Sequence, residues 1–533
     1  MTSPEVIETA RLWLAAEPDD DIRAELSELI ANDPEELERR FAGQLRFGTA
    51  GLRAPVGAGS LRMNRLVVRQ AAAGLANFLQ ATCPDGASRG VIIGFDARRK
   101  SEVFAMDTAR VCAGLGIRAL LFEQMVPTPL LAWSITEVGA MAGVMVTASH
   151  NPPADNGYKV YLETGAQIVS PVDLEIADAI ELIDPRTVRL SDPDDPLIEH
   201  LDGTFRGRYL ETIPAVRLRP EVASVPVAYT ALHGVGGSLL VDAFNAASLG
   251  TPMVVEGQQQ PDGTFPNVAF PNPEEPGAMD QVVSLAERSG AALALANDPD
   301  ADRLGAAIPT SSGWRRLGGD EIGWLLADHI LSNDQSQNRL VVTTLVSSSM
   351  LASIADHHGA TAIETFTGFK WIARTVLEHP DLHFVFGYEQ ALGYLVAERP
   401  LDKDGITAAV LLAEVAACAA ADGSSIEARL DELAAVHGRH LIVERSVAMT
   451  PEAGVAAVDA LRHEAPATIG TYPVREVVDF PEAGLLRFVL EGDLRVQVRP
   501  SGTEPKVKIY GEGRGVDPAE AVNAMVALLI GSG

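Results

Sequence analysis

The first of four polar loops that can act on a phosphate group contains a serine hydroxyl. Thr147-Ala-Ser149-His-Asn-Pro-Pro153 follows the apolar run 144–146, so Ser149 stands at the end of an expected buried strand. Open α/β sheets bind ligands at the ends of their strands, and a serine there can carry a phosphoryl group covalently. The plain alternative is that Ser149 caps a helix beginning at Pro152.

A serine hydrolase fits this loop less well. No Gly-x-Ser-x-Gly turn surrounds Ser149. His150 is its neighbour, and adjacent side chains on an extended backbone point to opposite sides. The two side chains are therefore not expected to form a nucleophile and base.

The second loop carries three aspartates, Asp298, Asp300 and Asp302, at every second position. On an extended backbone all three carboxylates face the same side. An EF-hand loop needs glycine at its sixth position and glutamate at its twelfth, where this chain has Arg303 and Pro309. The remaining interpretations are a Mg²⁺ site, where the ion neutralises charge on a transferring group, and a solvated acidic turn.

The other two loops are suited to phosphate and to sugar hydroxyls. Residues 499–505 combine a guanidinium, two hydroxyls and a glycine, which are the components of an anion nest, and Lys506 and Lys508 add positive charge. In the loop 387–394, the carboxylate of Glu389 can accept paired hydrogen bonds from vicinal hydroxyls. A plain hairpin turn is the alternative for the first of these loops.

Overall charge and composition limit the partners. A net charge of −30 and a pI near 4.7 argue against nucleic acid or an anionic membrane, so local cations must hold any phosphate. Without a basic and apolar leader or a long apolar run, and with three scattered cysteines, we expect a cytoplasmic protein with reduced thiols. Only six of the 42 basic residues are lysine, and all six lie in or beside loop motifs: Lys100, Lys159, Lys370, Lys403, Lys506 and Lys508.

The elements that must position these loops form an α/β protein of several domains. A chain of 533 residues is long enough for three or four domains at roughly 150 residues each. Apolar runs near 91–95, 119–122, 143–146, 291–296 and 340–345 are typical of buried strands separated by helices, and 1–40 predicts acidic helices. We expect three similar α/β mixed-sheet domains and a C-terminal α+β domain over residues 1–205, 206–317, 318–438 and 439–533.

The last block differs from the first three in its pattern. Leu494, Val496 and Val498 alternate with Arg495, Gln497 and Arg499, which is the period of antiparallel strands with one wet face.

In this order, the four loops resemble those of the α-D-phosphohexomutase superfamily, which includes phosphoglucomutases and phosphomannomutases. The similarity runs from Phe47 almost to the C-terminus. The variant loop Gly387–Tyr394, with Thr367–Lys370 and Leu401–Gly405, looks most like the branch of phosphopentomutase-like phosphoglucomutases. The resemblance implies four domains around a central cleft.

The resemblance also implies roles for individual residues. Ser149 would carry the phosphoryl group, with Arg53, Lys159 and Arg303 as catalytic neighbours and Lys159 as a candidate acid/base. Ser149, Asp298, Asp300 and Asp302 would hold Mg²⁺. The implied substrate-binding residues are Lys370, Glu389, Gln390, Tyr394, Arg499, Ser501, Gly502, Thr503 and Lys508.

The implied reaction is reversible transfer between the 1- and 6-positions of a hexose phosphate through a hexose 1,6-bisphosphate, which would also act as activator. Glucose phosphates are favoured, and phosphomannomutase or phosphopentomutase activity is the alternative by the same mechanism. A metal-dependent sugar phosphatase and a non-catalytic sugar-phosphate sensor are rivals from other classes. The partners would be small-molecule sugar phosphates, and the chain would be a monomer or homodimer.

Overall fold

The computed structural model describes residues 4–46, 51–501 and 505–531. The chain divides into two compact units, each treated by itself below. The first unit is Met1–Leu317 with Ala391–Ala421, and the second is Gly318–Gln390 with Asp422–Gly533.

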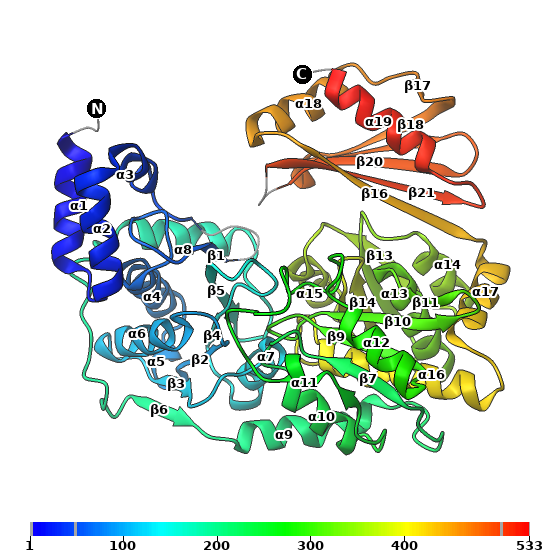
Figure 1. Ribbon diagram of the computed structural model, residues 1–533, viewed down its shortest axis with the longest axis horizontal. Helices are drawn as coiled ribbons and strands as arrows, with labels where there is room; N and C mark the ends of the chain where they lie inside the picture. Colours follow the sequence, from blue (N-terminus) through cyan, green and yellow to red (C-terminus); the bar gives the residue numbers. More distant parts are fainter. Residues whose placement is uncertain (1–3, 47–50, 502–504, 532–533) are drawn as a thin grey trace. The chain divides into compact units, whose positions relative to one another are not determined.

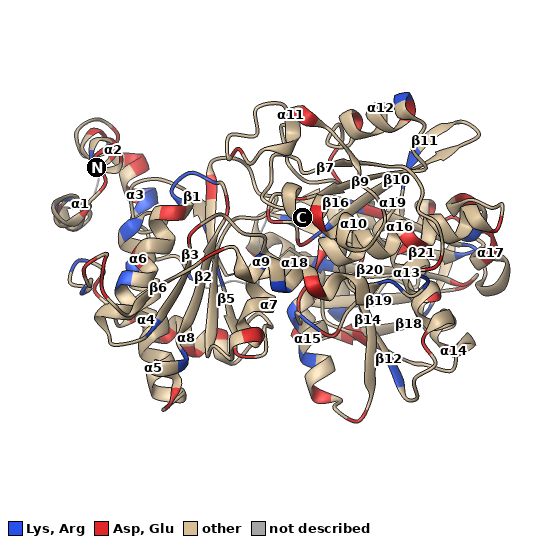
Figure 2. Ribbon diagram, turned by 90° about the horizontal axis from the view of Figure 1, so that it is seen from below, with Lys and Arg blue, Asp and Glu red and all other residues tan. Residues whose placement is uncertain are grey.

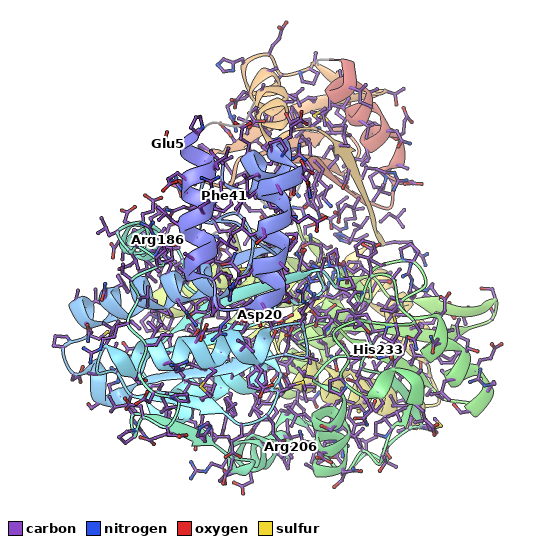
Figure 3. The ribbon with its side chains drawn as sticks, turned by 60° about the vertical axis from the view of Figure 1, so that its left-hand side comes forward. Glu5, Asp20, Phe41, Arg186, Arg206 and His233 are labelled. Carbon is purple, nitrogen blue, oxygen red and sulfur yellow. The ribbon has the colours of Figure 1, made fainter. Side chains whose placement is uncertain are left out.

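Three helices open the first unit: α1 (Pro4–Ala16), α2 (Asp20–Asn32) and α3 (Pro34–Arg40). Figures 1 and 3 show α1 and α2 lying side by side in opposite directions. The ring of Trp13 meets that of Phe41 edge to face, with centroids 5.7 Å apart. The helices expected over residues 1–40 are confirmed for the described residues.

The first sheet of this unit has six strands: β1 (Leu52–Pro55), β2 (Val91–Phe95), β3 (Ala119–Phe122), β4 (Ala142–Val146), β5 (Asp155–Leu162) and β6 (Ile198–Leu201). Their order is β1-β5-β4-β2-β3-β6. β2 runs parallel to β3 and β4, whereas β5 runs antiparallel to β4 and β1. Every residue of β2, β3 and β4 is buried, because a central parallel sheet is covered on both faces.

The helices that accompany this sheet are α4 (Arg65–Thr82), α5 (Gly86–Arg89), α6 (Ser101–Gly114), α7 (Thr128–Val138), α8 (Val172–Glu181) and α9 (Thr204–Thr212), followed by the 3₁₀ turn η1 (Ile213–Val216). The side chain of Asn64 caps α4 by accepting a hydrogen bond from the backbone N–H of Val67. α4 and α6 pack together and bury apolar side chains that include Leu75 and Phe104. The expected strands at 91–95, 119–122 and 143–146 are confirmed.

The second sheet of the first unit contains β7 (Val227–Thr230), β8 (Met253–Val254), β9 (Leu293–Asn297), β10 (Leu304–Thr310) and β11 (Gly313–Arg316), in the order β11-β10-β9-β7-β8. β7 and β9 are parallel, and β10 is antiparallel to β9 and β11. Its neighbours in sequence are α10 (Gly237–Ala246), α11 (Glu256–Gln259) and α12 (Asp280–Ser289).

Residues 391–421 return to this sheet after the chain has passed through the second unit. They form β15 (Gly393–Leu395) and α16 (Gly405–Ala421), and α16 packs on α10, β9 and β10. The buried ion pair between Arg217 and Glu414, 2.8 Å long, also ties α16 to the first unit. The division into four sequential domains stays a prediction.

The α/β half of the second unit contains β12 (Arg339–Thr344), β13 (Thr361–Thr365) and β14 (His383–Glu389), with β12 parallel to both neighbours. Its helices are α13 (Gly319–Asn333), α14 (Met350–His357), α15 (Phe369–Glu378) and α17 (Ile426–His437).

The α+β half is a sheet in the order β16-β21-β20-β19-β18-β17. Its strands are β16 (His440–Ala448), β17 (Thr468–Ile469), β18 (Tyr472–Phe480), β19 (Leu485–Leu490), β20 (Leu494–Pro500) and β21 (Lys506–Arg514). All pairs are antiparallel. The remaining elements are α18 (Pro451–His463), α19 (Ala519–Gly531) and the turn η2 (Pro481–Ala483).

The apolar face predicted for 494–499 is confirmed, but the opposite face is not wet throughout, because Gln497 is buried. Val496, Val498, Val507 and Ile509 belong to one apolar core with residues of α18 and α19. The polar residues of β20 and β21 consequently lie on the other face of the sheet.

The architecture is an α/β fold with mixed sheets, as the sequence predicts. Figure 2 shows Asp and Glu residues spread over many helices and loops, interspersed with Lys and Arg. No single helix of the described residues is long and apolar enough to span a membrane.

Candidate active site

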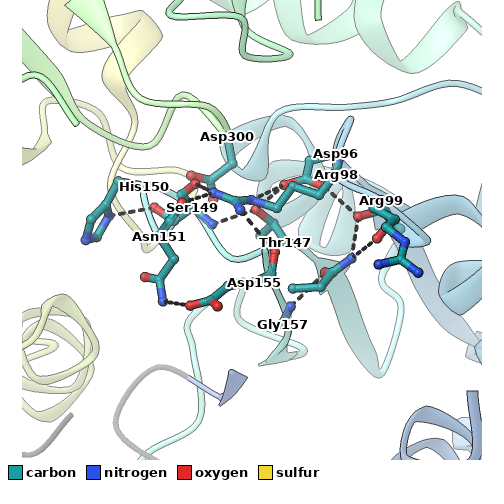
Figure 4. A network of polar contacts seen from close by, with 12 residues as sticks. Asp96, Arg98, Arg99, Thr147, Ser149, His150, Asn151, Asp155, Gly157 and Asp300 are labelled. Atoms are coloured by element: carbon teal, nitrogen blue, oxygen red, sulfur yellow. Dashed lines mark hydrogen bonds and ion pairs between the residues drawn. The ribbon is translucent and has the colours of Figure 1, made fainter. Parts of the chain in front are cut away.

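Ser149 lies two residues beyond Thr147, where the chain leaves β4, and it is 2% exposed. Its φ of +51° is in the left-handed region, which a non-glycine residue adopts only when its surroundings enforce it. The backbone N–H of Ser149 donates to Thr147 Oγ1 at 2.9 Å, and that hydroxyl donates to Asp96 Oδ2 at 2.7 Å (Figure 4). The side chains of Thr147 and Asp96, directly after β4 and β2, thus hold the backbone of Ser149 in place.

Arg98 holds the same loop through its carbonyl oxygens. Its guanidinium donates four hydrogen bonds, of 2.6 to 3.0 Å, to the carbonyls of Ser149, Asn151, Pro152 and Asp155 (Figure 4). The side chain is buried and lies over a phenylalanine ring, 5.1 Å from its centroid to the guanidinium carbon. One planar fork therefore organises the whole turn that carries the hydroxyl.

The structure corrects two expectations about Ser149. The backbone is not extended here, and His150 Nδ1 lies 3.1 Å from Ser149 Oγ, so the two side chains do meet. No helix begins at Pro152 either, because the chain turns and enters β5 at Asp155, so helix capping is not the role of Ser149.

The aspartate loop is also a turn rather than an extended segment. The N–H of Ala301 donates to the carbonyl of Asp298 at 2.9 Å, and Ala301 has a φ of +57°. The carboxylates still converge: Asp298, Asp300 and Asp302 are buried and each offers an oxygen within 4.8 Å of the others. The expected grouping is present, although alternation along a strand is not its cause.

Glycines of the loop that follows β7 pack against this turn. An added Cβ at Gly234 would meet the backbone of Pro299 at 2.5 Å, and one at Gly236 would meet the side chain of Ala301 at 2.4 Å. The N–H of Val235 donates to the carbonyl of Pro299 at 2.8 Å. The glycines of 234–237 thus allow two loops to approach closely, a role that the sequence analysis did not assign.

The three aspartates suit a hard cation. Oδ1 of Asp300 and Oδ1 of Asp302 are buried and, within the described part of the chain, have no hydrogen-bond partner. Oδ2 of Asp298 accepts a hydrogen bond of 2.7 Å from Ser149 Oγ. Buried carboxylate oxygens without donors, grouped around a hydroxyl, are the ligand set that Mg²⁺ prefers.

Two lysines supply positive charge at this cluster. Lys159 Nζ, on β5, lies 2.7 Å from Asp300 Oδ2 and 2.9 Å from Asp302 Oδ2. Lys403 Nζ lies 3.4 Å from Asp302 Oδ2. Lys403 was missing from the predicted site, although its place among the six lysines of loop motifs was a usable signal.

Neighbouring charges shift the pKa values of the three carboxylates in different directions. Burial, with the charges of Asp302 and Asp300, raises the pKa of Asp298 well above its usual value. Burial also opposes ionisation of Asp302, but Lys159 and Lys403 outweigh it and lower its pKa. Burial would lower the pKa of Lys159, yet Asp300 and Asp302 raise it. Lys159 is therefore held protonated, which favours a proton donor over a base.

Two arginines lie close to the serine. Arg53, on β1, donates from Nη1 to Asn151 Oδ1 at 3.1 Å, and burial lowers the pKa of its guanidinium. Arg303 follows the aspartate turn, and its N–H donates to Asp298 Oδ1 at 3.0 Å. Both guanidinium groups interact electrostatically with Asp302. The structure thus brings together all the predicted catalytic and metal-binding residues.

Thr128 is a further residue that the sequence analysis missed. Its hydroxyl donates to Asp300 Oδ2 at 2.5 Å, and its N–H donates to the Asp300 carbonyl at 2.9 Å. It stands at the start of α7, far from the aspartates in sequence, and only a Thr-Pro pair marked the position. Tyr394, predicted to bind substrate, is fully buried in β15 of the same unit.

The remaining predicted residues belong to the second unit. Lys370 is buried in the first turn of α15. Glu389, 7% exposed, ends β14, and Gln390 follows it. The carbonyl of Tyr388, just before Glu389, accepts a hydrogen bond of 2.9 Å from Thr343 Oγ1. This pairing holds the end of β14 against β12.

The predicted phosphate loop begins at the end of β20. Arg499 and Lys508 are register partners on β20 and β21, and Lys508 Nζ also pairs with Glu444 at 2.8 Å. The N–H of Ser501 donates to the carbonyl of Lys506 at 2.8 Å, which closes the base of the loop. Gly502 and Thr503 lie outside the described residues, so their predicted role in phosphate binding stays a prediction.

Comparison with family descriptions finds matches along nearly the whole chain. Residues 44–187, 207–313 and 318–436 match the phosphoglucomutase/phosphomannomutase α/β/α domains I, II and III, and 444–529 match the C-terminal domain of the same proteins.

Curated relatives match over most of their own length. The chain is 39% identical to a probable phosphomannomutase of Haemophilus influenzae, over 86% of this chain and 94% of the relative. It is 33% identical to human phosphopentomutase, over 95% and 90% of the two chains. It is 32% identical to human glucose 1,6-bisphosphate synthase, over 94% and 88%.

Solved structures share the fold. The putative phosphomannomutase from Thermus thermophilus superposes with a TM-score of 0.73 at 23% identity, covering 92% of this chain and all of the other.

Proposed function

This chain belongs to the phosphoglucomutase/phosphomannomutase family of phosphohexomutases, and we propose that it interconverts the 1- and 6-phosphates of a hexose, with glucose favoured. The observation that carries the proposal is the 2.7 Å hydrogen bond from Ser149 Oγ to Asp298, inside a buried cluster of three carboxylates. A hydroxyl so placed can carry a phosphoryl group whose charge a cation neutralises.

The reaction proceeds in two transfers. In the first transfer the bond between phosphorus and Ser149 Oγ breaks as a bond forms to the free sugar hydroxyl; the proton of that hydroxyl is released and Ser149 Oγ takes up a proton, which leaves a hexose 1,6-bisphosphate and a free serine hydroxyl. The bisphosphate turns end for end, and its other phosphoryl group is transferred to Ser149 Oγ; the serine hydroxyl loses its proton, and the sugar oxygen that leaves phosphorus gains one. Added hexose 1,6-bisphosphate would activate the enzyme by phosphorylating Ser149.

Side chains of the site have separate tasks in these transfers. Lys159, held protonated by Asp300 and Asp302, can neutralise charge on the transferring group and donate a proton to the leaving oxygen. Arg98 keeps the serine loop in its left-handed turn. Asp298, Asp300 and Asp302 would hold Mg²⁺, which when bound supplies charge neutralisation at the phosphoryl oxygens.

Residues of the second unit would bind the part of the substrate that does not react. Glu389, with Gln390 and Lys370, would bind sugar hydroxyls, and Arg499, Ser501 and Lys508 would bind the other phosphate. A guanidinium can bind two oxygens of one phosphate. These three residues, the phosphate clamp, would therefore hold the phosphate at either end of the sugar.

A pentose phosphate is the second candidate substrate. The human phosphopentomutase covers as much of this chain as any relative described above, at 33% identity. A mannose phosphate is a third candidate substrate, because the bacterial relative is named a probable phosphomannomutase. All three sugar phosphates would use the same site, so the choice among them depends on the pocket around the sugar.

A coupled assay across glucose, mannose, glucosamine and ribose 1-phosphates tests the proposal. We expect at least one of these sugar 1-phosphates to be converted to the sugar phosphorylated at its other end, with glucose 1-phosphate the best substrate. Glucose 1,6-bisphosphate should stimulate the reaction. Release of inorganic phosphate in place of an isomerised sugar phosphate would identify a phosphatase. Absence of both products with tight binding would identify a sensor.

A further inference from the structure

A serine turn in the second unit contacts the proposed sugar loop and the two strands that flank the proposed phosphate loop. Ser347, Ser348 and Ser349 follow β12 and precede α14, and Ser347 and Ser348 are 0% and 2% exposed. The two buried hydroxyls, of Ser347 and Ser348, must have partners, because burying unpaired polar groups is costly. The partners of the turn include Gln390, directly after β14, on one side and Arg495 and Glu512, on β20 and β21, on the other.

On the side of the sugar loop, the turn holds Gln390. Ser347 Oγ donates to Gln390 Oε1 at 3.1 Å and accepts from the backbone N–H of Gln390, also at 3.1 Å. One hydroxyl therefore fixes both the side chain and the backbone of the residue after Glu389. The N–H of Ser348 donates to Asp320 Oδ1 at 2.7 Å, which also accepts from the Tyr388 hydroxyl at 2.7 Å.

On the side of the phosphate strand, the turn holds Arg495 and Glu512. Arg495 Nη2 donates to the carbonyl of Ser347 at 2.6 Å, and Arg495 Nε forms an ion pair of 2.6 Å with Glu512 Oε2. Ser348 Oγ donates to Glu512 Oε1 at 2.5 Å, and the N–H of Ser349 donates to the same oxygen at 3.0 Å. Charged groups make these bonds stronger than neutral ones.

The same sheet face carries the proposed phosphate clamp. Arg495 and Arg499 are four residues apart on β20, so their side chains leave the sheet on one face. β20 is thus anchored to the serine turn by Arg495 at one point and presents Arg499 two residue pairs further on. A shift of the anchor would shift the clamp.

We propose that the Ser347–Ser349 turn is a positioning element that keeps the sugar-hydroxyl loop and the phosphate-binding strand in register, with Ser347 and Arg495 as its positioning residues. The inference rests on the proposed function, which places Glu389 and Arg499 in substrate binding. A hexose phosphate must reach both loops at once, so the gain from binding its two ends together depends on their separation. Inorganic phosphate reaches only one loop, so its binding does not depend on the separation of the two loops.

Two variants test the turn from its two sides. Ser347→Ala removes the hydroxyl that holds Gln390 and leaves the carbonyl that Arg495 uses. Arg495→Lys keeps a positive charge beside Glu512 but cannot bind Glu512 and the Ser347 carbonyl with one planar fork. Arg339→Lys is the matched control, because Arg339 also binds backbone carbonyls from β12 but at Leu331, Asp334 and His358.

The measurement is equilibrium binding of glucose 1-phosphate and, separately, of inorganic phosphate. We expect Ser347→Ala and Arg495→Lys each to weaken glucose 1-phosphate binding about tenfold while inorganic phosphate binding changes less than about twofold. Arg499→Ala weakens both ligands, and Arg339→Lys weakens neither. Thermal melting of each variant shows that it is folded.

Two results would overturn the coupling. If Ser347→Ala weakens both ligands equally, the turn supports the phosphate strand alone, and if it weakens neither, the turn is only part of the core. Failure of the proposed function looks different, because glucose 1-phosphate binding would then be insensitive to Arg499→Ala as well. That result would contradict both the phosphate-binding role of Arg499 and the coupling of the two loops.

Discussion

Ser149 Oγ and Asp298 Oδ2 share a hydrogen bond of 2.7 Å, although 149 residues separate them in the chain. Asp298 is the carboxylate of its cluster whose pKa burial and the neighbouring aspartates raise. Asp300 and Asp302, by contrast, pair with Lys159. The serine hydroxyl thus hydrogen-bonds to Asp298, while the ammonium of Lys159 pairs with the other two carboxylates of the cluster.

Replacing Ser149 with alanine removes the carrier hydroxyl. We expect mutase turnover to fall by roughly 10³-fold or more, because no side chain replaces the covalent carrier. The free energy of unfolding should change by only about 1 kcal/mol, the net value of one hydrogen bond. Intact mass of the parent enzyme should show one partly occupied phosphoryl group that the variant lacks, and turnover near that of the parent would refute the covalent mechanism.

Asp300→Asn tests the cation site. The neutral amide is a weaker ligand than the carboxylate, so we expect weaker binding of Mn²⁺, used as a spectroscopic probe in place of Mg²⁺, and a lower kcat with a smaller change in KM. Titration of Mn²⁺ measures binding without turnover. Asp242→Asn, at an exposed ion pair, is the control. Full activity of the parent in excess chelator would contradict the metal assignment.

Arg98→Lys tests the organisation of the serine loop. An ammonium cannot span the four carbonyls that the guanidinium binds, so the left-handed turn at Ser149 loosens. We expect kcat to fall about 10- to 100-fold with little change in KM, since Arg98 acts through the position of the nucleophile. Single-turnover phosphorylation of Ser149 by glucose 1,6-bisphosphate measures this step.

The adjacent Arg99→Lys is the control for Arg98, because Arg99 is more than half exposed and pairs with Asp21. An equal loss in both variants would mean that general surface charge, rather than the loop, is responsible.

Arg499 is expected to hold the phosphate that is not being transferred. Arg499→Ala should raise KM in both reaction directions and lower kcat, because remote binding energy helps to orient the reacting oxygen. Lysine should restore only part of the activity, since it cannot grip two oxygens. Steady-state kinetics in both directions decide the matter, and a change in one direction alone would indicate two separate phosphate sites.

Asp320 makes the stability of the chain depend on pH. Burial raises the pKa of Asp320 from 3.8 to about 7 in the folded state. The folded state then binds the proton more tightly, so its contribution to stability is complete below about pH 4 and is lost as the pH rises to about 7. Asp320→Asn keeps an acceptor for Tyr388 and Ser348 without this loss.

Denaturant titrations from pH 4 to pH 8 check the prediction for Asp320. The difference in free energy of unfolding between Asp320→Asn and the parent should grow in favour of the variant by as much as roughly 4 kcal/mol across the window. Glu17, whose pKa burial also raises to about 7, contributes equally to both proteins and cancels in the difference. A difference that does not change with pH would contradict the prediction.

The sequence by itself determined the local features of the site. Buried strands are marked by short apolar runs, and the loops that follow them by Ser149, the aspartate triplet and Arg499, because strand periodicity and residue chemistry act over a few neighbours. The alternation in β20 likewise predicted a polar and an apolar face. These signals sufficed for the fold class and for the family.

Only the tertiary structure decided which of these features meet. The ion pair of Lys159 with Asp300 joins residues 141 positions apart, and no local pattern encodes such a pairing. The left-handed backbone at Ser149 turned the serine toward His150, against the rule for extended chains, because Arg98 and Thr147 enforce it. Part of the polar face of β20 is buried against the Ser347–Ser349 turn, because Arg495 donates a hydrogen bond to the carbonyl of Ser347. Long-range packing selects these contacts, and its energy exceeds the local preferences from which a sequence can be interpreted.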